Sequence, residues 1–220
     1  EIFFFFLTMF IVYEGLDNTG KTTQARLLHE RLVKELGDDK VLLLKEPGGS
    51  LVSQQMRTII SQNPTLPIRV QAHLFMAGIF NTYIEVIKPA LAEGKIIILD
   101  RYVPSTYAYQ IHTNGLYDLK ATIALLPEPD LWFYTYNDTD EDIKREAVED
   151  MDEVGYYYAT LRDKIKEAYV HMFISPDINN LSIPTFVSHK VRSFNVNDKL
   201  EDNIQKAYNK VMDTYYMEMI

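Results

Sequence analysis

The chain has 220 residues, of which 47% are hydrophobic and 24% charged, a composition typical of a globular protein. It contains no cysteine, which excludes disulfides, thiol catalysis, cysteine-based zinc sites and iron–sulfur clusters. The formal net charge of -9 argues against a general nucleic-acid-binding surface, because such a surface needs an excess of Lys and Arg. A local basic pocket that handles phosphate groups is still compatible with this acidic body.

The apolar run at residues 2–7 is far shorter than the roughly 20 residues needed to span a bilayer. No basic segment precedes it and no small-residue cleavage site follows, so we expect neither a signal peptide nor a membrane partner. We expect residues 1–8 to be an upstream extension, with Met9 as the natural start of one cytoplasmic domain over 9–220. The alternative is an extra apolar segment that packs on a neighbouring surface.

Strand-like apolar runs alternate with helix-like stretches along the rest of the chain. The expected strands are 10–13, 41–44, 96–99, 131–136 and a last one near 191–194. The expected helices are 21–36, 51–60, 68–93, 117–125, 140–148, 157–172 and about 200–217, with an irregular insertion at 175–189. The first four strands are near-continuous apolar runs, as in strands buried on both faces of a parallel sheet. This alternation predicts a doubly wound α/β fold with a five-stranded parallel sheet flanked by helices.

A phosphate-binding loop follows the first expected strand. Residues 15–22 satisfy the pattern G-x-x-x-x-G-K-[ST], and an amphipathic helix comes directly after. The glycines let backbone N–H groups turn toward phosphates, and the helix N-terminus adds its dipole. Lys21 would reach the β- and γ-phosphates of ATP, and the Thr22 hydroxyl would bind Mg²⁺. The expected ATP-binding residues are Gly15, Asn18, Thr19, Gly20, Lys21, Thr22 and Thr23.

A second signal lies at the end of the strand expected at 96–99. Asp100 stands where a carboxylate that organises Mg²⁺ is needed, and Arg101 can clamp phosphoryl oxygens through its planar fork. The alternative is an Asp–Arg pair that only caps the strand. Together with the loop, this strand end indicates a P-loop NTPase or kinase and no narrower class.

Beyond these two motifs, the chain resembles the thymidylate kinase family of nucleoside-monophosphate kinases. The resemblance covers 10–169 and 189–220 and rests on several segments in the family order. These are Glu14-Gly15-Leu16-Asp17 with Gly20-Lys21-Thr22-Thr23-Gln24, Glu46-Pro47-Gly48-Gly49, Leu74-Phe75, Val86-Ile87-Lys88-Pro89-Ala90-Leu91, Asp100-Arg101-Tyr102, Ser105-Thr106, Ala108-Tyr109-Gln110 and Pro129-Asp130-Leu131. It implies a kinase that uses ATP and Mg²⁺ to convert dTMP to dTDP, with a lid at about 142–160 and a homodimeric assembly.

The family pattern implies how the base of the acceptor would be recognised. Phe75 would stack on the pyrimidine, while Thr106 and Gln110 would read its polar edge; a phenylalanine on an apolar helix face is otherwise usually a core residue. Where the family usually carries an arginine bonded to the base carbonyl, this chain has Ile79. An unpaired polar edge changes base discrimination strongly, so dUMP, a 5-modified dUMP or another dNMP stays an alternative to dTMP.

The same pattern implies how the sugar and phosphate would be held. Arg57 and Arg101 would bind the monophosphate, and the turn that begins at Glu46 would line the acceptor site. Asp17 would contact the sugar 3′-hydroxyl, and Tyr109 would lie near C2′ and favour deoxyribose. From sequence alone, Arg57 could instead be a solvated surface residue and Glu46 part of a plain turn. Asp17 could likewise be an ordinary loop carboxylate and Tyr109 a packed aromatic.

The chain departs from the family in its catalytic cations, which the family supplies as an arginine in the phosphate loop or the lid. Asn18 stands in this loop, and residues 146–160 contain no Lys or Arg. The nearest cations flank that stretch, and we expect Arg145 to act with Lys21, Arg101 and Asp17 in catalysis. A nucleotide-binding homologue with weak catalysis stays an alternative, as do a P-loop ATPase and a nucleoside kinase.

Overall fold

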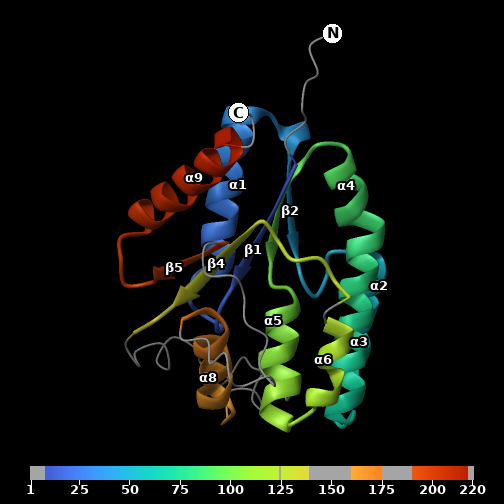
Figure 1. Cartoon of the computed structure of the whole chain (residues 1–220). Helices are drawn as coiled ribbons and strands as arrows, with labels where there is room; N and C mark the ends of the chain where they lie inside the picture. The colour runs from blue at the N-terminus through green and yellow to red at the C-terminus, as the bar shows by residue number, and fades with distance from the viewer. Residues whose placement is uncertain (1–7, 124, 139–159, 175–189, 218–220) are drawn as a thin grey trace.

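The computed structural model describes residues 8–123, 125–138, 160–174 and 190–217. Five parallel strands form one sheet in the order β2-β3-β1-β4-β5 (Figure 1). The strands are β1 (Met9–Glu14), β2 (Val41–Lys45), β3 (Ile96–Asp100), β4 (Leu131–Tyr136) and β5 (Val191–Asn195). Each overlaps an expected strand, so the predicted parallel α/β sheet is confirmed.

Helices follow or precede each strand of the sheet. They are α1 (Lys21–Leu36), η1 (Asp38–Lys40), α2 (Leu51–Gln62), α3 (Ile68–Thr82), η2 (Tyr83–Ile87), α4 (Lys88–Ala92), α5 (Val103–Thr106), η3 (Tyr107–His112), η4 (Tyr117–Leu119), α6 (Lys120–Ile123), α8 (Arg162–Phe173) and α9 (Leu200–Met217). The helix expected at 68–93 contains a π-helical turn, η2, between α3 and α4. The helix expected at 140–148 and the insertion at 175–189 lie outside the described residues, as does the expected lid up to residue 159.

The helical segment formed by α5 and η3 was not predicted from the sequence. It is rich in β-branched and aromatic residues, such as Thr106 and Tyr107, which have low intrinsic helix propensity. Burial of its apolar side chains, among them Ala108 and Ile111, outweighs that propensity. The segment matters because it carries three of the expected acceptor-site residues.

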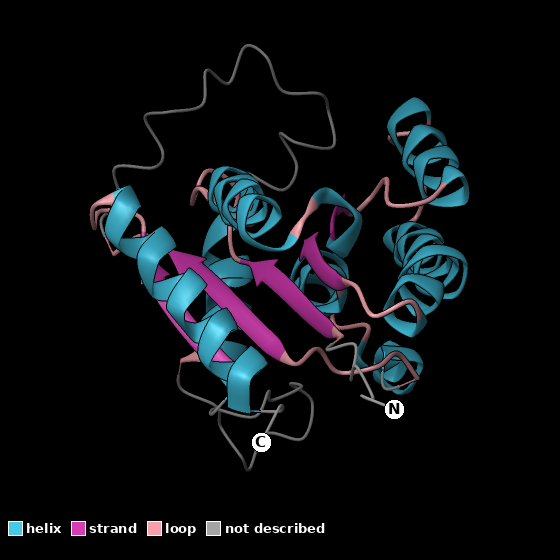
Figure 2. Ribbon diagram, turned by 90° about the horizontal axis from the view of Figure 1, so that it is seen from above, coloured by secondary structure: helices cyan, strands magenta, loops and turns pink. Residues whose placement is uncertain are grey.

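Side-chain alternation along the strands divides the hydrophobic core into two halves. Phe10 and Val12 of β1 face the side covered by α3, η3 and α8. Met9, Ile11 and Tyr13 face the opposite side, where α1 and α9 pack. Figures 1 and 2 show the resulting three layers, with helices on both faces of the sheet. The same alternation directs Glu14 away from α1 and toward the α8 side.

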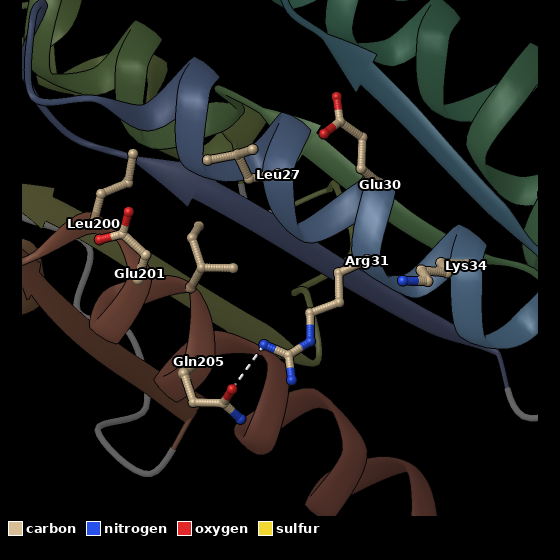
Figure 3. A pocket seen from close by; sticks show the side chains of 8 residues that line it. Leu27, Glu30, Arg31, Lys34, Leu200, Glu201 and Gln205 are labelled. Atoms are coloured by element: carbon tan, nitrogen blue, oxygen red, sulfur yellow. Dashed lines mark hydrogen bonds between the residues drawn. The ribbon is translucent and has the colours of Figure 1, made fainter.

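A groove lies between α1 and α9, on the outer side of the helical layer that these two helices form (Figure 3). Arg31 crosses it and donates a hydrogen bond to Gln205 Oε1 at 2.8 Å. Its lining consists of Leu27, Glu30, Arg31, Lys34, Leu200, Glu201, Ile204 and Gln205. This lining contains none of the expected ATP-binding or acceptor-site residues. Within the described part of the chain, no helix has the length and apolar character needed to cross a membrane.

Candidate active site

The phosphate loop joins the end of β1 to the start of α1 and is closely fitted to β4. Gly15 has a φ of 143°, and a Cβ at this position would lie only 2.1 Å from the carbonyl oxygen of Thr135. Gly20 has a φ of 78°, which also favours glycine. Thr19 closes the loop by donating to the Leu16 carbonyl at 2.8 Å, and its hydroxyl lies 2.8 Å from that of Thr135. These contacts fit the loop closely against β4.

Lys21 and Thr22 begin α1, as the motif predicts. Lys21 is buried, and its ammonium donates to the carbonyl of Leu16. Burial and the nearby Arg101 lower the pKa of Lys21 to about 7, against the opposing effect of Asp17 and other carboxylates. A bound phosphate would favour the charged form, because a close anion raises the pKa of an amine. Thr22 and Thr23 are exposed on the first turn of the helix.

Thr22 and Asp100 meet as oxygen donors at the end of the sheet. The Thr22 hydroxyl donates to Asp100 Oδ2 at 2.5 Å. The other carboxylate oxygen, Oδ1, is buried and has no hydrogen-bond partner among the described residues. One hydroxyl and one carboxylate with a spare lone pair fit Mg²⁺, which binds few protein oxygens and takes its other ligands from phosphates and water. The expected metal site therefore has a suitable donor set.

Arg101 and Tyr109 form one charged cluster with Asp17 of the phosphate loop. Arg101 has a left-handed φ of 75°, and its guanidinium contacts the carboxylate of Asp17. Tyr109 donates to the other oxygen of Asp17 at 2.7 Å, and its ring lies 5.2 Å from the guanidinium carbon of Arg101. Burial raises the pKa of Asp17, but Arg101, Lys21 and the Tyr109 hydroxyl together lower it to about 2. The structure thus brings together three residues that the family pattern had grouped.

Glu14 lies beneath Arg101 and was not singled out from the sequence as a site residue. Its fully buried carboxylate accepts hydrogen bonds from Tyr102 N at 2.7 Å, Ser105 Oγ at 2.8 Å and Tyr169 Oη at 2.9 Å. Burial raises the pKa of Glu14, while Arg101 and these donors oppose the rise. The contacts tie β1 to α5 and α8. A carboxylate directly before the phosphate loop was the available signal, but Tyr169 is too distant in sequence to pair with it by pattern.

Glu46 stands at the turn after β2, where it was expected. Its carboxylate accepts hydrogen bonds from the Ser53 hydroxyl and, at 3.3 Å, from Gly48 N, and burial raises its pKa. A Cβ on Gly49 would lie 2.7 Å from Glu46 Oε1, so the turn is tightly packed. Glu46 therefore fixes the turn and the start of α2.

The remaining acceptor-site residues lie on helices that pack together. Phe75 is half-buried on α3, which contacts both α5 and η3, where Thr106 and Gln110 are buried. Arg57 is exposed on α2, one turn after Ser53 and therefore on the same helix face. Ile79 on α3 is 4% exposed and belongs to the core. A buried apolar side chain therefore stands where the family usually carries an arginine. Arg145 lies outside the described residues, and its catalytic role stays a prediction.

Comparisons with known proteins agree on one family. A family model described as thymidylate kinase matches residues 13–185. The thymidylate kinase of Ehrlichia ruminantium (strain Gardel) is 42% identical over 108 residues, so the match spans 49% of this chain and about half (54%) of that relative. The thymidylate kinase of Staphylococcus epidermidis is 29% identical over 217 residues, with 94% of this chain and 98% of the relative covered. A crystal structure of thymidylate kinase from Ehrlichia chaffeensis is similar with a TM-score of 0.65 and 25% identity, over 94% of this chain and 99% of that one.

Proposed function

The chain belongs to the thymidylate kinase family, and from this premise we propose that it transfers the γ-phosphoryl group of ATP to dTMP and so forms dTDP. The observation that carries the proposal is the meeting of two groups of residues at one end of the sheet. Asp17, Lys21 and Thr22 belong to the phosphate loop. Asp100 and Arg101 stand at the end of β3, where Asp100 accepts a hydrogen bond from Thr22 and Arg101 contacts the Asp17 carboxylate. The γ-phosphate of ATP and the acceptor phosphate would therefore meet next to the positive charges of Lys21 and Arg101.

The reaction needs positioning and charge neutralisation and no covalent intermediate. An oxygen of the acceptor phosphate is already a competent nucleophile, so no general base is required. Lys21 would hold the β- and γ-phosphates, and Arg101 would orient the acceptor phosphate toward them. Mg²⁺, held by Thr22 and Asp100, would supply further positive charge when bound. Asp17 and Tyr109 hold the Arg101 guanidinium and would also face the sugar of the acceptor.

The acceptor site would lie between α2, α3 and the α5–η3 segment. Arg57 would reach the monophosphate from α2, and the turn at Glu46 would line the pocket. Phe75 would stack on the base, with Thr106 and Gln110 at its polar edge. All of these assignments come from the family pattern, and the packing of α3 on α5 and η3 supports them.

A different base is a second candidate because of Ile79. An apolar, buried side chain at this position offers the base carbonyl no hydrogen bond. Discrimination between dTMP, dUMP and other monophosphates would then depend on Thr106 and Gln110. Incubating the protein with ATP, Mg²⁺ and each of dTMP, dUMP, dCMP, dGMP, dAMP and UMP distinguishes the candidates. Diphosphate formation from dTMP above all others supports the first, and preference for another base supports the second.

The proposed assembly is a homodimer that binds no nucleic acid. Three large apolar side chains of α2 and η2, Leu51, Ile59 and Ile84, are 70%, 41% and 55% exposed, which supports a pairing surface on this flank. Sedimentation at micromolar concentration would detect the dimer, and a purely monomeric protein would contradict it. The cytoplasmic location expected from the sequence stays a prediction.

A further inference from the structure

A cation that the sequence did not single out lies at the metal end of the site. Lys45 is the last residue of β2 and pairs in register with Asp100 of β3. Residues in register on neighbouring parallel strands point to the same face of the sheet. Asp100 is likewise in register with Tyr13 of β1, whose side chain packs on the α1 side. Lys45 and Asp100 therefore both point toward the start of α1.

The ammonium of Lys45 contacts both expected metal donors. Its Nζ lies 3.4 Å from Thr22 Oγ1 and 3.7 Å from Asp100 Oδ2. The Lys45 side chain is 59% exposed, whereas that of Asp100 is 3% exposed. The Asp100 carboxylate therefore lies at the buried base of the expected metal site, and the Lys45 ammonium lies at its solvent-exposed edge. Lys21 differs in being buried and bonded to the loop carbonyl of Leu16.

Lys45 also lies at the boundary between the donor and acceptor sides. The next residue, Glu46, begins the turn that leads into α2, so the backbone of Lys45 connects that turn to the sheet. A phosphoryl group that moves between the two sides needs positive charge along its path. Asn18 supplies none from the phosphate loop, and residues 146–160 contain neither Lys nor Arg.

We propose that Lys45 is a catalytic residue whose ammonium binds oxygens of the γ-phosphoryl group at the Thr22–Asp100 site and neutralises its charge during transfer. This inference rests on the proposed function. In the transfer, the bond between the γ-phosphorus and the β–γ bridging oxygen breaks, and a bond from an acceptor phosphate oxygen to the same phosphorus forms. Lys45 gives up no proton. Its flexible stem lets Nζ leave the two donors when a metal binds them and turn to the phosphate.

Activity measurements with Lys45→Met, Lys45→Arg and Lys40→Met test the proposal. Lys40 stands just before the other end of β2 and pairs with Asp39 at 3.2 Å, so its replacement controls for loss of a surface lysine. We expect Lys45→Met to lower kcat about 100-fold with little change in KM for dTMP, because the charge acts in the transition state. Lys45→Arg should recover most of that loss, and Lys40→Met should behave as wild type.

Binding measurements test Lys45 without the transfer reaction. Calorimetry with Mg²⁺ and either ADP or the imido analogue of ATP should show Lys45→Met weakening the analogue roughly tenfold or more while ADP affinity is retained, because ADP has no γ-phosphate. An unchanged ratio of the two affinities, whether both are retained or both fall by the same factor, overturns the inference. If the wild type forms dTDP and Lys45→Met is equally fast, Lys45 is not catalytic and the proposed function stands. If the wild type forms no dTDP, the proposed function fails and the affinity ratio still decides on Lys45.

Discussion

The hydroxyl of Tyr169 offers a direct test of the hydrogen-bond network beneath Arg101. It is fully buried on α8, donates to Glu14 Oε2 at 2.9 Å and lies 2.9 Å from Ser105 Oγ. Tyr169→Phe removes this oxygen and keeps the ring that stacks on Tyr134 and Phe173. Because the acceptor is a buried carboxylate, the lost hydrogen bond should lower the free energy of unfolding by about 1.5–3 kcal/mol.

Tyr13→Phe is the matched control. Tyr13 is also fully buried, but its hydroxyl has no hydrogen-bond partner among the described residues. Removing an unpartnered buried hydroxyl takes away only its desolvation penalty, so stability should be unchanged or slightly higher. Both changes delete one oxygen from a core tyrosine, and their difference therefore isolates the hydrogen bonds of Tyr169.

Urea unfolding of the two variants and the wild type, followed by circular dichroism, gives the free energies. In a domain of this size, a loss of 1 kcal/mol lowers the unfolding temperature by about 2–4 °C, so thermal scans provide a second reading. Ser105 also accepts a hydrogen bond from the Arg101 guanidinium at 2.9 Å, so Tyr169→Phe should lower kcat more than ATP affinity. Equal stability of the two variants, or a Tyr169→Phe protein as stable as wild type, would refute the network.

Three further changes address the phosphate loop and its charges. Gly15→Ala introduces a Cβ 2.1 Å from the Thr135 carbonyl and should abolish ATP binding in calorimetry; retained affinity would mean that the loop is not closely fitted to β4. Lys21→Ala should abolish phosphoryl transfer without lowering the unfolding temperature, because the buried ammonium has a pKa lowered to about 7 by desolvation; near-normal turnover would remove the phosphate-loop assignment. For Asp17, a folded-state pKa of about 2 lies below the usual value of about 3.9, so its stabilising effect is complete above the unfolded pKa and is lost as the pH falls toward 2. The stability difference between wild type and Asp17→Asn, measured by urea unfolding, should thus be constant above pH 5 and narrow below pH 4, and a difference that grows on acidification would contradict this pKa.

The sheet could be predicted because its information is local. The first four strands are near-continuous apolar runs, such as Ile96-Ile97-Ile98-Leu99, and the phosphate-loop pattern gives the end of β1 and the start of α1. The α5–η3 segment could not be predicted in the same way. Its residues favour strands by propensity, and only packing against the core makes them helical.

In the candidate site too, residues that belong to local motifs could be predicted, whereas contacts between distant segments could not. Lys21, Thr22, Asp100 and Arg101 follow from the positions of motifs at strand ends, and the family pattern added Asp17 and Tyr109. Contacts between distant segments were not predictable, because no spacing rule links Glu14 to Tyr169 or Lys45 to Thr22. The contact between Lys45 and Thr22 depends on the register of the strands and on which side chains share a face of the sheet. Both are known only once the strand order is known.

The central claim is that the γ-phosphoryl group passes to a nucleoside monophosphate and not to water. Incubation with Mg²⁺ and ATP labelled in the γ-phosphate, with and without dTMP, tests this most directly. The account predicts label in dTDP when dTMP is present and almost no inorganic phosphate when it is absent. Inorganic phosphate released equally fast without dTMP, with no labelled dTDP, would contradict it.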